Sequence, residues 1–120
     1  MIRSGLILAA LLMAPAAAMA EPQGLPGHYY LSGMTEVGSE LLLRGDGRYR
    51  WMLAYGALDL AVEGSWTRSG DTVTLVADPG TLAEDGMESI FARMELTIAK
   101  DGALVPVEDL RGAYRKGRKY

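Results

Sequence analysis

The chain has 120 residues and no cysteine, and its formal net charge is −3 with hydrophobic residues making up 49% of it. This length and apolar content suit one globular domain with a single core. The lack of cysteine excludes disulfides and a cysteine nucleophile, so the core alone must stabilise the fold.

The first twenty residues, MIRSGLILAALLMAPAAAMA, predict a secretory signal peptide. Arg3 precedes an apolar run, and the segment closes on Ala18, Met19 and Ala20, the small-x-small pattern of a cleavage site. The apolar run is too short to span a bilayer. We therefore assign residues 1–20 to a cleaved signal peptide. We expect a periplasmic or secreted protein with no integral membrane segment and, without cysteine, no lipid anchor after cleavage.

The charges of the remaining chain are distributed unevenly. Residues 21–110 contain 6 basic and 15 acidic residues, whereas residues 111–120 contain 5 basic and no acidic ones. The acidic body argues against nucleic acid as a partner, because binding to phosphate backbones needs clustered Lys and Arg. The basic C-terminal tail at residues 116–120 is interpreted as a solvated terminus, with binding to an anionic surface as the alternative.

Period-two alternation dominates the sequence after a short lead-in at residues 21–27, EPQGLPG. Tyr49, Trp51 and Leu53 fall on one side of a strand, while Arg50 and Met52 fall on the other. The pattern predicts eight short strands at residues 28–32, 39–43, 49–55, 58–66, 72–77, 90–98, 103–107 and 112–115. One long acidic connection, residues 78–89, separates two of them.

Two Asp-Gly pairs, Asp46-Gly47 and Asp101-Gly102, lie between apolar runs. Asp-Gly is typical of two-residue hairpin turns, whose backbone needs positive φ angles. The first pair overlaps the tripeptide Arg44-Gly45-Asp46, which integrins recognise on extracellular proteins. A projecting turn explains this tripeptide without an adhesive role.

Strands at such regular spacing predict an all-β fold for residues 28–115. The expected architecture is an antiparallel up-and-down meander of about eight short strands that curls into a small barrel or a sandwich. No helix of useful length is predicted after the signal peptide.

The run GSELLLRGDGRYRWMLAYGALDLAVEGSW, residues 38–66, has a strand, an Asp-Gly turn, an aromatic strand and a strand ending in Gly-x-Trp. With Gly27-His28-Tyr29, which is similar to the Gly-x-Trp of a first lipocalin strand, it resembles small bacterial exported lipocalin-like (calycin-type) β-barrel proteins, mostly of unassigned function. The resemblance implies a lipocalin-like barrel that binds small apolar ligands or protein partners. It also implies a basic residue near the last strand, for which Arg115 is the candidate.

Catalytic and metal-binding patterns are weak throughout the sequence. His28 is the one histidine, and no cysteine accompanies it, so a Ser or Cys nucleophile with a histidine base is not indicated. The methionines are scattered, and the carboxylates Glu84, Asp85 and Glu88 do not follow the spacing of an EF-hand loop. We therefore expect no enzyme activity, no metal and no cofactor.

The sequence thus predicts a non-catalytic exported binding domain with an unidentified ligand. The first hypothesis is a small apolar molecule held at the barrel mouth by Tyr29, Tyr55 and Trp66, since aromatic side chains at an open end offer apolar area. The alternative is a protein-interaction module, such as an envelope accessory factor or an inhibitor. Its partner would be an envelope protein.

Cleavage after Ala20 is directly testable. We expect the intact mass of the exported protein to correspond to a chain that begins at Glu21, because the small-x-small pattern ends at Ala20. Mass spectrometry of the exported fraction measures this. A mass that still includes residues 1–20 in that fraction would contradict the assignment.

Overall fold

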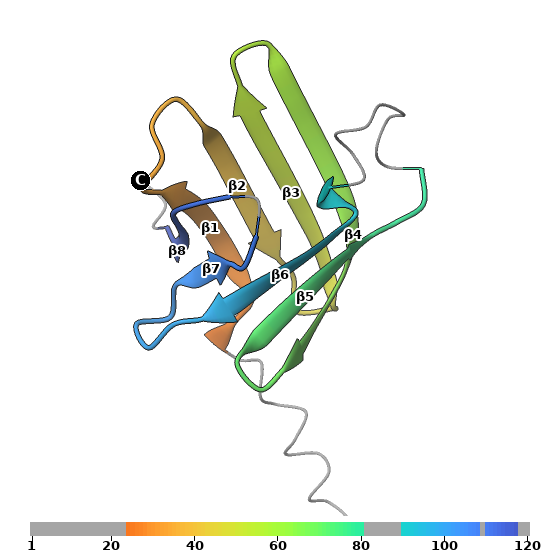
Figure 1. The fold of residues 1–120 in the computed structure, drawn as a ribbon. Helices are drawn as coiled ribbons and strands as arrows, with labels where there is room; N and C mark the ends of the chain where they lie inside the picture. The colour runs from red at the N-terminus through yellow and green to blue at the C-terminus, as the bar shows by residue number, and fades with distance from the viewer. Residues whose placement is uncertain (1–23, 81–89, 109, 118–120) are drawn as a thin grey trace, which may run out of the picture.

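The computed structural model describes residues 24–80, 90–108 and 110–117. It contains eight strands in a closed antiparallel barrel, in which each strand pairs with its neighbour in sequence and β1 pairs with β8 (Figure 1). The strands are β1 (Gly27–Ser32), β2 (Gly38–Leu43), β3 (Arg48–Tyr55), β4 (Leu58–Ser69), β5 (Thr72–Ala77), β6 (Arg93–Ile98), β7 (Leu104–Pro106) and β8 (Ala113–Lys116). The predicted all-β meander is confirmed, and it forms a barrel rather than a sandwich.

The folded barrel includes residues from both segments that flank the predicted domain. The signal peptide assigned to residues 1–20 lies outside the described residues. In the lead-in, Leu25 is buried and belongs to the core cluster. At the other end, Lys116 forms the last residue of β8. The barrel strands therefore run from Gly27 to Lys116.

The interior is formed by the alternate residues that the period-two pattern assigned to it. Tyr49, Trp51 and Leu53 of β3 are buried, and the intervening Arg50 and Met52 are exposed. The remaining strands also bury one side. The buried members of the continuous core cluster are Leu25, Tyr29, Leu41, Leu43, Tyr49, Trp51, Leu53, Val62, Trp66, Val73, Leu75, Phe91, Met94, Leu96, Leu104 and Tyr114. Burial of these apolar side chains is the main source of stability in a chain without disulfides.

The strand predicted at residues 90–98 begins later than expected. Ile90 and Phe91 have helical backbone conformation, and β6 starts at Arg93. Alternation through residues 90–98 places Ile90 and Ala92 on the same side as Met94, but both are exposed, while Phe91 is buried against Trp51 with ring centroids 4.7 Å apart. A helical turn shifts the side-chain phase relative to a strand, so alternation could not be extended through it.

Both Asp-Gly turns contain three loop residues, so the predicted two-residue geometry is wrong. The Arg44 and Arg48 backbones pair across the first loop at 2.9 Å, Gly47 N–H donates to the Arg44 carbonyl at 3.1 Å, and Gly47 has a φ of 88°. The Asp46 carboxylate accepts the Arg48 N–H at 3.0 Å, which holds this residue in the turn. The loop from Ala99 to Ala103 repeats every one of these contacts. Only the glycine needs a positive φ in this turn type.

Gly64 marks a close approach inside the barrel wall. A Cβ atom at this position would lie 2.0 Å from the carbonyl oxygen of Val76 and 2.8 Å from the ring of Tyr49, its cross-strand partner. The Tyr49 ring occupies the space that a side chain at residue 64 would need. Its burial, together with the nearby Asp78 carboxylate, raises the pKa of Tyr49 to about 12.

A chain of hydrogen bonds crosses the barrel interior. The Trp51 indole N–H donates to the Tyr114 hydroxyl at 2.9 Å, and Tyr114 and Ser39 hydroxyls lie 2.7 Å apart. Ser39 donates its own proton to the Met52 carbonyl at 2.6 Å, so Tyr114 must be the donor to Ser39. The chain joins β3, β8 and β2, and it satisfies each polar group that these buried side chains carry into the core.

We expect Tyr114→Phe to lower the free energy of unfolding by about 1–3 kcal/mol, because the Trp51 N–H would remain buried without an acceptor. Urea denaturation of the two proteins measures the difference. Tyr55→Phe is the matched control, since this tyrosine is 54% exposed and its change should stay within about 0.5 kcal/mol. Equal effects of the two substitutions would contradict the role given to the Tyr114 hydroxyl.

Candidate functional site

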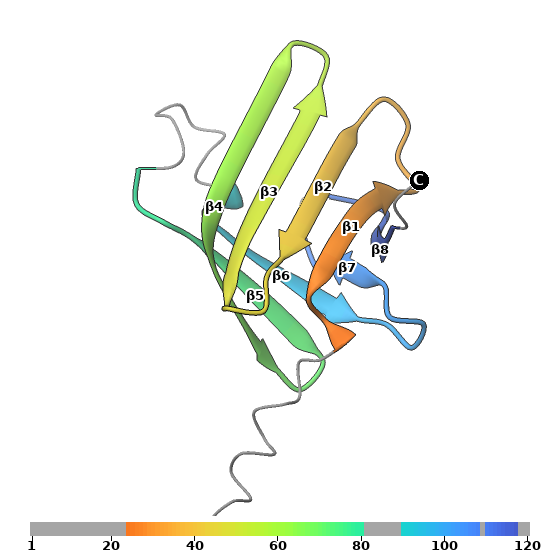
Figure 2. The ribbon, with the colours of Figure 1, turned by 180° about the vertical axis from the view of Figure 1, so that it is seen from behind.

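A groove lies on the outside of the barrel, over the four strands that Figure 2 shows side by side, β1 to β4. Its volume is about 720 Å³. We call it the outer groove, and it is lined by His28, Glu40, Leu42, Arg50, Trp51, Met52, Asp59, Leu60, Ala61, Val62 and Glu63. Most of these residues occupy the solvent-facing positions of their strands, so the groove is separate from the packed interior.

Strand register brings the outer side chains together in two rows. In the first row, His28 of β1 pairs with Leu42 of β2, which pairs with Arg50 of β3, and Arg50 pairs with Glu63 of β4. In the second row, Tyr30, Glu40, Met52 and Ala61 follow in the same strand order. Apolar Leu42 and Met52 therefore lie diagonally to each other on the two central strands, next to charged Glu40 and Arg50, and Ala61 follows Met52 on β4.

Two ion pairs bridge neighbouring strands of the outer groove. His28 Nε2 lies 2.8 Å from Glu40 Oε1, and the imidazole stacks on Tyr30 with ring centroids 4.6 Å apart. Between β3 and β4, Arg50 Nε lies 3.2 Å from Glu63 Oε2. These exposed pairs contribute little to stability, but they fix the positions of charges that a partner would meet.

Asp59 is the third carboxylate of the outer groove. It is exposed in β4, beside Ala54 of β3, and it forms no ion pair with any residue in the described ranges. Glu40 and Glu63 already face His28 and Arg50. The groove thus presents one carboxylate that is available to a cation from outside the chain.

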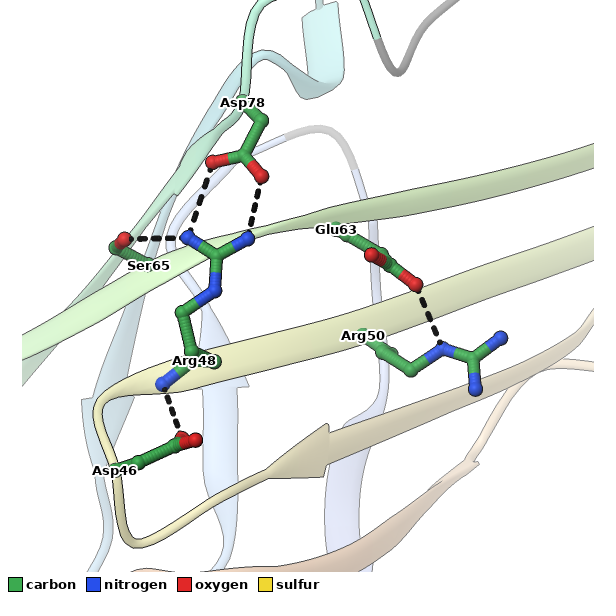
Figure 3. A network of polar contacts seen from close by, with 6 residues as sticks. All are labelled: Asp46, Arg48, Arg50, Glu63, Ser65 and Asp78. Carbon is green, nitrogen blue, oxygen red and sulfur yellow. Dashed lines mark hydrogen bonds and ion pairs between the residues drawn. The ribbon is translucent and has the colours of Figure 1, made fainter.

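An arginine clamp borders the outer groove at the start of β3 (Figure 3). Arg48 donates to both carboxylate oxygens of Asp78 and, at 3.0 Å, to Ser65 Oγ, while its backbone N–H binds Asp46. The clamp connects β3 across β4 to the segment that follows β5. The hydrogen bond from Arg48 is the main reason why the pKa of Asp78 lies below its ordinary value of 3.8.

The three aromatic residues predicted to line a barrel mouth are not brought together. Tyr29 is buried and donates its hydroxyl to the Leu25 carbonyl at 2.7 Å, and Trp66 is buried and donates its indole N–H to the Arg44 carbonyl at 2.9 Å. Tyr55 is exposed beside the β3–β4 turn, at the opposite end of the β3–β4 hairpin from Trp66. Only Tyr55 has free ring surface for a ligand.

Two basic residues, Arg115 and Lys116, lie in the last strand. Arg115 points outward and donates to Asp101 at 2.8 Å. Lys116 instead lies over the Tyr29 ring, with Nζ 5.6 Å from its centroid, and donates to the Gly24 carbonyl at 2.8 Å. The β1–β8 register pairs Tyr29 with Lys116 and places the neighbouring Arg115 on the other face.

Sequence reasoning missed the outer groove, although one signal was present. Met52 and Ala54 fall on the side of β3 assigned to solvent, and Ala61 falls on that side of β4. Apolar residues at several outward positions of adjacent strands are unusual enough to indicate a contact surface. Their convergence depends on strand register, which the alternation pattern does not give.

Neither a metal site nor a membrane-spanning helix emerges from residues 24–80, 90–108 and 110–117. Within these ranges, no group of three or more His, Asp or Glu side chains is arranged to hold a metal ion. The same part of the chain has no helix long and apolar enough to cross a membrane.

Comparison with known proteins gives one distant structural likeness. No protein-family model matches the chain, and no curated protein matches it. The fold is similar to the crystal structure of the Cpx pathway activator NlpE from Escherichia coli, with a TM-score of 0.49 and 16% sequence identity. The likeness covers 80% of this chain, which spans 48% of the NlpE chain. This degree of similarity assigns neither family nor function.

We expect the arginine clamp to make stability depend on pH in the acid range. Because the pKa of Asp78 is lowered in the folded protein, its ionised carboxylate stabilises the fold fully above the ordinary pKa of 3.8. This stabilisation is lost as the pH falls through the pKa of the folded state. Denaturation curves at a series of pH values should therefore show a shallower acid loss of stability for Asp78→Asn than for the parent.

Arg48→Met provides the control for this measurement. In that background the cause of the lowered Asp78 pKa is absent, so adding Asp78→Asn should leave the acid slope unchanged. If Asp78→Asn altered the slope equally in both backgrounds, the clamp would not be the origin of the effect.

Proposed function

We propose that this protein is a non-catalytic exported binding domain that recognises a protein partner through the outer groove. The observation that carries the proposal is the outward-facing apolar patch of Leu42, Met52 and Ala61, which is interspersed with the His28–Glu40 and Arg50–Glu63 pairs. Protein interfaces commonly combine apolar and polar contacts. Export is inferred from the signal-peptide pattern of residues 1–20.

The charge of the outer groove favours a basic segment as the occupant. Its three carboxylates exceed the single guanidinium of Arg50, and Asp59 has no ion-pair partner within the described residues. The body of the protein, residues 21–110, carries 15 acidic against 6 basic residues. A partner segment with a Lys or Arg near Asp59 and an apolar side chain over Met52 would complement both features.

The absence of catalysis is part of the proposal. His28, the one candidate base, is held by Glu40 and stacked on Tyr30 on an exposed strand surface. Such a surface is open to water, whereas general base catalysis and oxyanion stabilisation usually require a site from which water is excluded. Binding therefore accounts for this arrangement better than chemistry does.

A small apolar ligand remains a second candidate because of Tyr55. This ring is 54% exposed, and the half-buried Leu58 and Leu60 follow it in the β3–β4 hairpin. In contrast, Tyr29 and Trp66 are buried with their polar atoms already bonded, so they contribute little free surface. Any such ligand would contact the tip of this hairpin rather than a ring of three aromatic residues.

A photo-crosslinking residue at position 52 tests the protein-binding proposal. In envelope extract, we expect crosslinking to one protein through a segment that contains Lys or Arg, whereas the same residue at the exposed Val105 of β7 should not capture it. Asp59→Lys should reduce the affinity about fivefold, as expected for about 1 kcal/mol of exposed charge pairing, and added salt should act in the same direction.

The same protein preparation distinguishes the two candidates. Equal capture at positions 52 and 105, or capture that is insensitive to Asp59→Lys, would contradict the role of the outer groove. Saturable binding of a hydrophobic fluorescent probe near one equivalent, abolished by Tyr55→Asp but not by Met52→Lys, would support the small-ligand candidate instead.

A further inference from the structure

β4 extends beyond β5 and leaves part of a sheet edge uncovered within the described residues. β4 pairs with β5 only from Gly64 to Ser69, and the Asp78 N–H adds a bond to the Glu63 carbonyl at 2.9 Å. On its other side, β4 stays paired with β3 back to Leu58. Figure 1 shows the upper part of the β3–β4 hairpin standing apart from β5. Residues 58–62 of β4 thus have a strand on one side only, among the residues described.

The backbone groups at this edge can be identified from their neighbours. Trp66 N–H donates to Gly47 on the β3 side, whereas the Glu63 carbonyl accepts from Asp78 on the opposite side. Because bonding directions alternate along an antiparallel strand, Asp59 and Ala61 direct their N–H and C=O groups to the uncovered side. Neither residue forms a backbone hydrogen bond there with the described residues. An edge of this kind is a template for another strand.

We propose that a second copy of this chain pairs with this edge through its own β4, antiparallel and in a register centred on Leu60. In this register, Asp59 of each copy exchanges backbone hydrogen bonds with Ala61 of the other, so both residues become satisfied in both copies. Leu60 faces its own counterpart, and Leu58 faces Val62. The contact is two-fold symmetric and therefore closed.

Charge selects this register over its neighbours. A register centred on Asp59 would place two aspartates opposite each other. One centred on Ala61 would place Asp59 opposite Glu63, and it would require the Glu63 carbonyl that Asp78 already occupies. Like charges in directly opposite positions destabilise a strand pair. The register around Leu60 sets Asp59 opposite Ala61 and avoids both conflicts.

The apolar side chains support the same occupant. Leu58 and Leu60 are only half-buried in the described structure, although they belong to the inner side of β4 and pack against the core cluster. A second β4 would cover them with Leu60 and Val62 of the other copy. The edge is thus self-complementary in its backbone and side chains.

Engineered cysteines test the register, because the chain has none of its own. Leu60→Cys should form a crosslinked dimer on oxidation, since residues opposite each other at a non-hydrogen-bonded position have Cα atoms about 4.5 Å apart, within disulfide reach. Leu58→Cys is the matched control on the same side of the same strand. Its counterpart would lie roughly 13 Å away, four residues along the edge, so it should remain reduced.

Ala61→Pro tests the backbone pairing. Proline removes an N–H that β3 does not use, so the hairpin can keep its ladder while the dimer loses a bond in each half. Sedimentation of the exported protein should show a dimer whose dissociation constant rises about tenfold or more in this variant, with circular dichroism unchanged. A parent protein that stays monomeric, equal crosslinking at positions 58 and 60, or a well-folded Ala61→Pro that dimerises as the parent does would overturn the proposal.

Discussion

The Tyr114 hydroxyl is the point at which distant parts of the barrel wall are joined. It accepts from Trp51 of β3 and donates to Ser39 of β2, while its own strand, β8, closes the barrel against β1. A buried polar chain of this kind tolerates few alternative packings, because any shift would leave one of its members without a partner. It therefore fixes how the strands that carry the outer groove lie relative to one another.

Side chains occupy the centre of the barrel, so the recognition that we propose falls on its outside. Eight strands enclose a space that side chains can just fill, and here Tyr29, Trp51 and Tyr114 lie within it together with many aliphatic residues. The wall then acts as a rigid support for outward-facing side chains, whose positions follow from the strand register. Rigid presentation of Met52 and its neighbours lowers the ordering cost that a binding partner would face.

The sequence was sufficient for the number of strands, their order and most of the core, because alternation and turn chemistry are local properties. It was insufficient wherever a contact joined distant segments. Phe91 entered the core through a helical turn that alternation could not reveal, and Lys116 rather than Arg115 met Tyr29 because of the β1–β8 register. The outer groove was missed for the same reason, since Leu42 and Met52 converge only once β2 and β3 are in register.

The seam between β1 and β8 has a consequence for how the barrel assembles. Every other ladder joins strands that are neighbours in sequence, whereas Tyr29 must find Lys116 across nearly the whole domain. Closing so long a loop costs conformational entropy, and the stabilising contacts between β1 and β8 form only after the loop has closed. Until the seam closes, the meander is an open sheet whose first and last strands are both free to pair elsewhere. We expect barrel closure to be the slow step of folding, and the interval before it to be the period of greatest exposure to aggregation.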